Sequence, residues 1–145
     1  MGIEAKGGKP EILDEIYKKT CRPKITGPAF IIHYPASAFP LAKPSDSNPA
    51  VSASFQLVVA GYELVKAFSE LNNPILQRER FEEQEKILKQ GFEEAQPTDD
   101  DFIEALEYGM PPAAGFGMGV DRLAALLTDS HALREIILFP TMKPK

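Results

Sequence analysis

Three glycines at alternate positions, followed closely by an arginine, have the types and spacing that most directly suggest chemistry in this chain. Gly115, Gly117 and Gly119 leave one side of an extended segment without side chains, so a flat or charged ligand could approach the backbone closely. Arg122 adds a planar, permanently charged guanidinium group that suits phosphate oxygens. Glycines also mark bulges, bends and tight packing, so the pattern leaves both ligand binding and packing open.

This glycine pattern differs from two common phosphate-binding loops. A P-loop has a lysine followed by Ser or Thr after its last glycine, and a dinucleotide-binding fold has its glycines in a turn between strand and helix. Here Leu123, Leu126 and Leu127 follow Arg122 at helical spacing. The segment is therefore expected to be a strand that runs straight into a buried helix, with Arg122 at the helix N-terminus.

A second group of candidate residues lies on a segment with the period of a strand. Lys66, Phe68 and Glu70 share one face of this strand, and a carboxylate beyond an aromatic ring suits an alkyl ammonium ligand. Glu63 has the opposite parity and joins that face only if a β-bulge intervenes, while Gln56 lies across the hairpin. Carboxylates beside a phosphate-binding arginine would suit magnesium held together with a nucleotide. The alternative is that both glutamates are solvated positions of a half-exposed strand.

The remaining reactive side chains have simpler explanations. His33 ends an apolar strand and His131 lies in an expected turn, so both are given structural roles. The aspartates at positions 99–101 could suggest a metal site, but Thr98 with Asp101 forms a capping box, and negative charge suits the start of a helix. No Ser/His/Asp or Cys/His arrangement for nucleophilic catalysis is recognisable.

The composition sets limits on the class of protein. With 145 residues and 43% hydrophobic content, the chain can bury one modest core. The net charge of −5 argues against a surface that binds nucleic acid by bulk electrostatics. The single cysteine, Cys21, excludes an intrachain disulfide and fits a reducing cytoplasm. No export signal is visible, and no window approaches the roughly 18 apolar residues of a membrane span.

Helices and strands alternate along the chain without regular βαβ spacing. Helices are expected over residues 10–20, 73–92 and 98–109, and again after Arg122; strands are expected over a buried run at 29–34, a hairpin at 55–60 and 62–71 around Gly61, and the glycine segment. Residues 35–53 suit a long surface loop, and 136–139 form a last apolar run. This order favours an α+β domain, with a largely antiparallel sheet and helices on one side, over a parallel doubly wound fold.

Several segments together resemble the C-terminal part of a class II lysyl-tRNA synthetase. Residues 115–123 are similar to the third signature motif of the class, and residues 68–72 resemble the segment that separates the lysine enzymes from the aspartate and asparagine ones. Residues 105–112 and 138–144 also resemble the lysine family. The resemblance covers residues 10–145, the C-terminal half of a catalytic domain with a mainly antiparallel sheet, after a flexible N-terminus at 1–9.

The resemblance implies ATP-dependent activation of lysine to lysyl-adenylate and transfer of lysine to tRNA(Lys). Arg122 would be the catalytic residue that holds the γ-phosphate of ATP. Gly115, Gly117 and Gly119 would let adenine and ribose approach the sheet. The implied cofactors are ATP and Mg2+, and the implied location is the cytoplasm.

The same resemblance assigns the second group of residues to lysine and metal binding. Glu63 matches a glutamate that binds magnesium beside ATP, Phe68 would flank the substrate side chain, and Glu70 would receive its ε-ammonium. Two positions depart from the family pattern. Gln56 replaces a second magnesium-binding glutamate, which removes one negative charge, and Lys66 replaces an asparagine that contacts the substrate. Because Lys66 and Glu70 share a face, we hypothesise that they pair and that Lys66 competes with free lysine.

The first and second motifs of the class and the anticodon-binding domain have no counterpart in this sequence. The first motif builds the dimer, and the second carries the arginine for the α-phosphate, so the chain alone is expected to be inactive or weak. A homodimer, or pairing with the missing N-terminal half, is the expected assembly. Two other functions remain open: a paralogue that attaches lysine to a protein, and a non-catalytic module that binds nucleotide, lysine or a partner.

Overall fold

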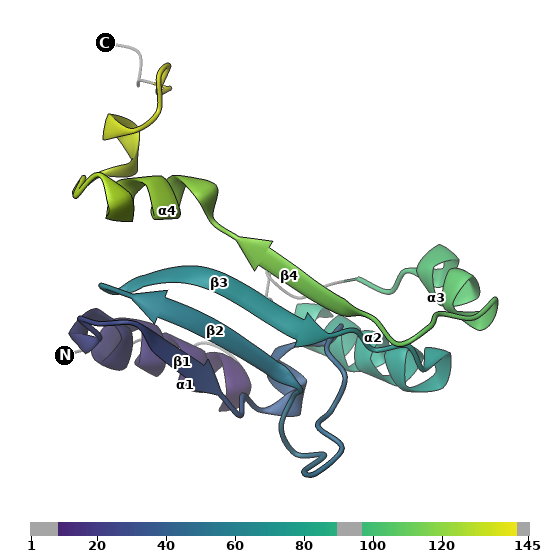
Figure 1. Cartoon of the computed structure of the whole chain (residues 1–145). Helices are drawn as coiled ribbons and strands as arrows, with labels where there is room; N and C mark the ends of the chain where they lie inside the picture. The colour runs from purple at the N-terminus through teal and green to yellow at the C-terminus, as the bar shows by residue number, and fades with distance from the viewer. Residues whose placement is uncertain (1–8, 90–96, 142–145) are drawn as a thin grey trace.

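Four antiparallel strands form one sheet in the order β1-β2-β3-β4 (Figure 1). The computed structural model describes residues 9–89 and 97–141. The strands are β1 (Ala29–Ile32), β2 (Ser54–Val59), β3 (Tyr62–Ser69) and β4 (Ala114–Met118). The expected α+β fold with an antiparallel sheet is confirmed. The flexible segment expected over residues 1–9 falls almost entirely outside the described residues.

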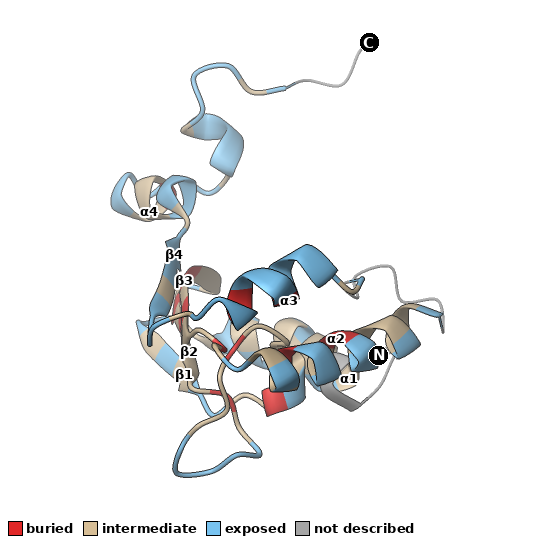
Figure 2. Ribbon diagram, turned by 90° about the vertical axis from the view of Figure 1, so that its right-hand side faces the viewer, coloured by how far each residue is buried: buried red, intermediate tan, exposed pale blue. Residues whose placement is uncertain are grey.

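Helices cover one side of this sheet. They are α1 (Lys9–Ile16), α2 (Pro74–Lys89), α3 (Asp100–Glu107) and α4 (Val120–Leu127), with the short turns η1 (Tyr17–Cys21), η2 (Arg22–Lys24), η3 (Ala36–Ala38) and η4 (Leu133–Glu135). Figure 2 shows α1, α2 and α3 on the same side of the sheet, whereas α4 lies beyond the end of β4. The side of the sheet away from α1–α3 is open among the described residues.

The β2–β3 hairpin contains the bulge that decides where Glu63 points. Ala60 (φ 49°) and Gly61 (φ 76°) form the tight turn, as left-handed residues do in two-residue hairpins. Leu57 pairs with Val65, but the next residue of β2, Val58, pairs with Glu63. Leu64 is therefore the extra residue of β3. Since a bulge shifts the alternation by one, Glu63 joins the face that carries Lys66.

Two elements expected to be buried are exposed instead. The strand at 29–34 is shorter than expected, because His33 adopts a positive φ of 63°, and it lies at the sheet edge with Phe30 64% and Ile32 54% exposed. The helix after the glycines buries only Ala125, and Leu127 is 77% exposed. Both expectations were wrong for one reason: apolar periodicity shows which face seeks a partner, but not whether the described residues supply one.

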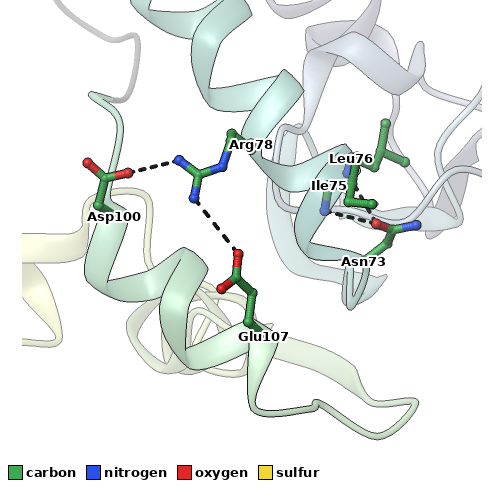
Figure 3. A network of polar contacts seen from close by, with 6 residues as sticks. All are labelled: Asn73, Ile75, Leu76, Arg78, Asp100 and Glu107. Carbon is green, nitrogen blue, oxygen red and sulfur yellow. Dashed lines mark hydrogen bonds and ion pairs between the residues drawn. The ribbon is translucent and has the colours of Figure 1, made fainter.

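Helix ends follow their capping residues with one correction. The Oδ1 atom of Asn73 accepts hydrogen bonds from the Ile75 and Leu76 amides at 3.0 and 3.2 Å, so α2 begins as expected (Figure 3). The helix α3 is capped by Asp99, whose carboxylate accepts from the Phe102 amide at 2.9 Å. The expected cap, Thr98, was wrong by one position. The expected end of α2 near Phe92 lies outside the described residues.

Helices α2 and α3 pack together and are linked by one arginine. The Arg78 guanidinium contacts Asp100 at 3.0 Å and Glu107 at 4.0 Å (Figure 3). Beneath these exposed ion pairs, Phe81 and Ile103 are 3% and 0% exposed. Exposed pairs contribute little to stability, so apolar burial holds the two helices together. Gly109 then ends this segment in a left-handed conformation, with φ at 107°.

Candidate functional site

The sheet register places the candidate residues on one face. Gln56 pairs with Lys66 across β2 and β3, Lys66 pairs with Gly117 of β4, and Phe68 pairs with Gly115. Directly paired residues of antiparallel strands point to the same side, and the bulge adds Glu63 to them. We call this side, which carries Gln56, Glu63, Lys66, Phe68, Glu70, Gly115 and Gly117, the glycine face.

The three positions are occupied by glycine for different local reasons. A Cβ atom at Gly115 would overlap the Oε1 atom of Glu70, so the Glu70 carboxylate lies where a side chain would be. A Cβ at Gly119 would lie 3.1 Å from the Cδ atom of Arg122, which folds back over this position. Among the described residues, a Cβ at Gly117 would have only the carbonyl oxygen of Lys66 within 4 Å, at 3.8 Å. Packing therefore accounts for Gly115 and Gly119, whereas Gly117 leaves open space above the sheet.

Arg122 is anchored at the bulge of β3. It lies in the first turn of α4, as expected, and its Nη1 atom donates a hydrogen bond to the carbonyl oxygen of Glu63. The Gly119 amide donates to the carbonyl of Leu64, the extra residue, at 2.9 Å. A guanidinium has five N–H donors, so an exposed arginine held in this way keeps further donors for an anion.

Three side-chain contacts link four residues over the middle of the glycine face. The Tyr34 hydroxyl donates to Oε1 of Gln56 at 2.6 Å, and the Tyr34 and Phe39 rings lie 5.0 Å apart. The Nζ atom of Lys66 lies 3.8 Å from the centre of the Phe39 ring, and Lys66 pairs with Gln56. We call Tyr34, Phe39, Gln56 and Lys66 the Lys66 cluster.

Tyr34 and Phe39 were missed as site residues from the sequence. Both follow β1, in a stretch that its Pro, Ser and Ala content assigned to a strand end and a surface loop. The loop instead packs over the sheet: Ala36 and Ala42 are 6% and 0% exposed. The available signal was the presence of two aromatic rings in an otherwise small and polar stretch, since an aromatic side chain gains much from the area that it buries.

Burial perturbs two groups of the Lys66 cluster. It lowers the pKa of the Lys66 ammonium, and the nearby Glu63 carboxylate partly opposes this shift. Burial also raises the pKa of the Tyr34 hydroxyl, with a further contribution from Tyr17, whose ring packs edge-on against that of Tyr34 at 6.4 Å. Tyr34 is therefore a neutral hydrogen-bond donor at physiological pH.

The structure does not place Lys66 against Glu70. The Lys66 ammonium lies on the Phe39 ring, and the Glu70 carboxylate lies against Gly115. Within residues 9–89 and 97–141 no ion pair joins the two side chains at 4.0 Å or less. The histidines lie elsewhere: His33 is exposed after β1, and the backbone carbonyl of His131 accepts from the Tyr62 hydroxyl at 3.3 Å.

The Gln56–Glu63 region has a poor set of ligands for magnesium. Mg2+ requires oxygen donors and favours carboxylates. Here Glu63 offers one carboxylate, the Gln56 oxygen already accepts the Tyr34 hydroxyl, and the positively charged Lys66 is the strand partner of Gln56. Among the described residues no three His, Cys, Asp or Glu side chains gather as a metal site would require. These residues do not fit a two-carboxylate magnesium site.

A separate hollow lies between α2 and α3 and contains none of the candidate residues. Its volume is about 460 Å³, and it is lined by Arg78, Asp100, Glu104, Glu107 and Tyr108. Arg78 already pairs with two of these carboxylates, as Figure 3 shows. In the described part of the chain, no helix has the length and apolar character needed to cross a membrane.

The antiparallel sheet, the glycine strand and the arginine in the following helix define a class of protein. A family model described as "tRNA synthetases class II (D, K and N)" matches residues 9–143, and the chain belongs to this family. The resemblance noted in the sequence is thereby confirmed.

Curated relatives narrow the resemblance to the lysine enzymes. The chain is 49% identical to the "Lysine--tRNA ligase" of Moorella thermoacetica, over 100% of its own length and 30% of the relative's. It is 50% identical to that of Porphyromonas gingivalis, over 95% of the chain and 24% of the relative. A third, from Carboxydothermus hydrogenoformans, is 46% identical over 99% and 29%. The chain thus corresponds to less than a third of the length of these relatives.

Proposed function

We propose that this chain forms part of a lysyl-tRNA synthetase, which activates lysine with ATP and transfers it to tRNA(Lys) in the cytoplasm. One observation carries the proposal: the β3 bulge and the strand register bring Glu63, Phe68 and Glu70 onto the face opened by the glycines. The family and the names of the relatives support the same reaction.

Lysine would be recognised by charge. Glu70 offers a carboxylate to the ε-ammonium, and Phe68, two positions earlier on the same face, flanks the alkyl chain. A carboxylate that is partly removed from water favours a cationic side chain over a neutral one, because an unpaired charge at that place is costly. The part of the glycine face around Gly115 is therefore proposed as the lysine side of the site.

ATP would bind across Gly117 towards Arg122. The open space at Gly117 admits a flat ring or a sugar, and the Arg122 guanidinium would hold the γ-phosphate. A carboxylate oxygen of lysine attacks the α-phosphorus, a new P–O bond forms, and pyrophosphate leaves. The reaction then needs positioning and charge neutralisation rather than a nucleophile of the protein. A terminal ribose hydroxyl of tRNA next attacks the lysyl carbonyl, and AMP leaves.

The metal and the assembly follow from the same proposal. The family implies Mg2+ with ATP, but the Gln56–Glu63 region offers a poor ligand set, so no step is assigned to an ion held there. The chain is expected to work with a second copy or with further sequence that completes the domain. Alone it should be inactive or weak, because Arg122 reaches only one end of the triphosphate.

Lysine-dependent exchange of pyrophosphate into ATP tests this proposal in the complete protein. Glu70→Gln should raise KM for lysine by about 100-fold, since a charged pair becomes a neutral contact. Arg122→Ala should mainly raise KM for ATP. Glu104→Gln, at an exposed position of α3, is the matched control and should change neither constant. If both Glu70→Gln and Arg122→Ala leave the KM values of the exchange reaction unchanged, the proposal is contradicted and a non-catalytic module is favoured.

A further inference from the structure

The Lys66 cluster holds an ammonium group in a defined place on the glycine face. The aliphatic part of Lys66 extends from the middle of β3, and its Nζ atom rests 3.8 Å from the centre of the Phe39 ring. Phe39 packs on Tyr34 at 5.0 Å, and Tyr34 is hydrogen-bonded to Gln56, the strand partner of Lys66. Because each member contacts the next, the cation is positioned by the fold rather than by solvent.

The space beside this ammonium is open on one side. Gly117 is the strand partner of Lys66 on β4, and directly paired residues have Cβ positions about 4.5–5.5 Å apart. Gly117 has no side chain, and a Cβ there would meet only the Lys66 carbonyl oxygen, at 3.8 Å, within the part of the chain that the structure describes. A ligand group lying over Gly117 would thus meet the Lys66 side chain with no other side chain of β4 between them.

The charges around this place favour an anion over a metal ion. Gln56 is 6% exposed and carries no charge, and its oxygen is already occupied by the Tyr34 hydroxyl. The carboxylates that act on the Lys66 ammonium are those of Glu63 and Asp14. Asp14 is already paired with Lys18 at 2.6 Å, so Glu63 is the carboxylate left to oppose Lys66. A divalent cation would be repelled by Lys66 and would lack ligands, whereas a phosphate oxygen would find a positive charge already in place.

We propose that Lys66 is the cation that neutralises the phosphate group next to the sugar of a nucleotide bound over Gly117, taking the place of a magnesium ion between Gln56 and Glu63. This inference rests on the proposed function, because it assumes that the ligand of the glycine face is a nucleotide. It adds a specificity-determining residue: nucleotide binding at this face depends on Lys66 more than on magnesium. Gln56 and Lys66 act together, since one removes a metal ligand and the other supplies the charge.

A titration with metal alone tests the inference without a nucleotide. Mn2+ and Mg2+ are added to the complete wild-type protein and to the Gln56→Glu/Lys66→Asn double variant in a calorimeter. The double variant should gain a site that disappears when Glu63→Gln is added, and the wild type should show no Glu63-dependent site. A wild-type site that is lost in Glu63→Gln would overturn the inference. Thermal unfolding of each variant checks that it remains folded.

ATP titrations with EDTA and with excess Mg2+ provide the second test. In EDTA, Lys66→Asn should weaken ATP binding by about tenfold, as expected for loss of a charge-assisted contact, and Lys66→Arg should retain most of the affinity. Lys24→Gln, an exposed lysine of η2, is the control and should leave the affinity unchanged. Equal ATP affinity in Lys66→Asn would overturn the inference and leave the proposed function intact. Failure of the wild type to bind ATP in either condition would instead remove the proposed function, and the inference with it.

Discussion

The two faces of the sheet carry different kinds of side chain, although the same strands build both. The glycine face carries Gln56, Glu63, Lys66, Glu70 and two glycines together with the apolar residues Ile31, Val58 and Phe68, and the loop after β1 packs over its middle. The opposite face, which we call the apolar face, carries Phe30, Ile32, Phe55, Leu57, Val65, Ala67, Phe116 and Met118. Alternation along the strands thus gathers the charged and polar groups on one face, although that face also buries Val58, which is 0% exposed.

The apolar face is also the more exposed of the two at its large side chains. Phe30 and Phe116 are each 64% exposed, Ile32 is 54% and Met118 is 43%. On the glycine face, by contrast, Gln56 is 6% exposed and the Lys66 ammonium is covered by Phe39. Within the described residues the sheet thus shields polar groups at its centre, and it leaves large apolar side chains on β1 and β4 exposed for contacts made by something else, while Val65 and Ala67 between them are buried.

We expect the largest change in ligand binding from substitutions of two glycines on the same strand. Gly115→Ala should weaken lysine binding by about 100-fold, because the new methyl group displaces the Glu70 carboxylate. The methyl group of Gly117→Ala meets no atom of the described residues closer than 3.8 Å, so this change should leave lysine binding intact and reduce ATP binding by intruding on the ligand's space. Calorimetric titrations with each ligand measure both constants. Identical ligand profiles for the two variants would show that the glycine face is not divided in this way.

The sequence predicted the strands of this site better than the loop that packs over them. Alternation assigned Lys66, Phe68 and Glu70 to one face, and it allowed Glu63 to join them only if a bulge intervened; the register contains such a bulge. Side-chain alternation is local, so it can be read from one segment. The packing of Tyr34 over Gln56 joins residues 22 positions apart, and no short-range pattern reports such a contact.

The wrong predictions for the helix after the glycines and for the strand at the sheet edge have the same physical origin. The helical spacing of the leucines predicts that Leu127 is buried, yet the residue is 77% exposed. The partner of an apolar surface can lie on any other element. The cap of α3 was missed for a smaller reason: Thr98 and Asp99 can both accept a hydrogen bond, and only the backbone conformation selects Asp99.

A second expected effect concerns association through the apolar face. Phe30→Ser and Phe116→Ser each remove an exposed ring, and together they should weaken self-association of the chain by about tenfold or more, given the apolar area lost. Sedimentation velocity at several concentrations measures the change. Glu104→Gln, an exposed polar position on α3, is the control for handling and purity. An unchanged association constant would show that the apolar face is not the contact surface, and the edges of β1 and β4 would then be the next surfaces to alter.

The smallest expected effect tests whether the glycine face depends on its covering. Tyr34→Phe keeps the ring that packs on Phe39 and removes only the hydroxyl that donates to Gln56. A buried acceptor left without its donor costs about 1–3 kcal/mol, so the free energy of unfolding should fall by that amount in urea titrations. Tyr62→Phe, whose hydroxyl makes a longer 3.3 Å bond at an exposed site, should change stability by less. If Tyr34→Phe also weakens ATP binding in EDTA, the glycine face depends on its covering to position the Lys66 ammonium. If stability falls but ATP affinity is unchanged, Phe39 alone positions the ammonium.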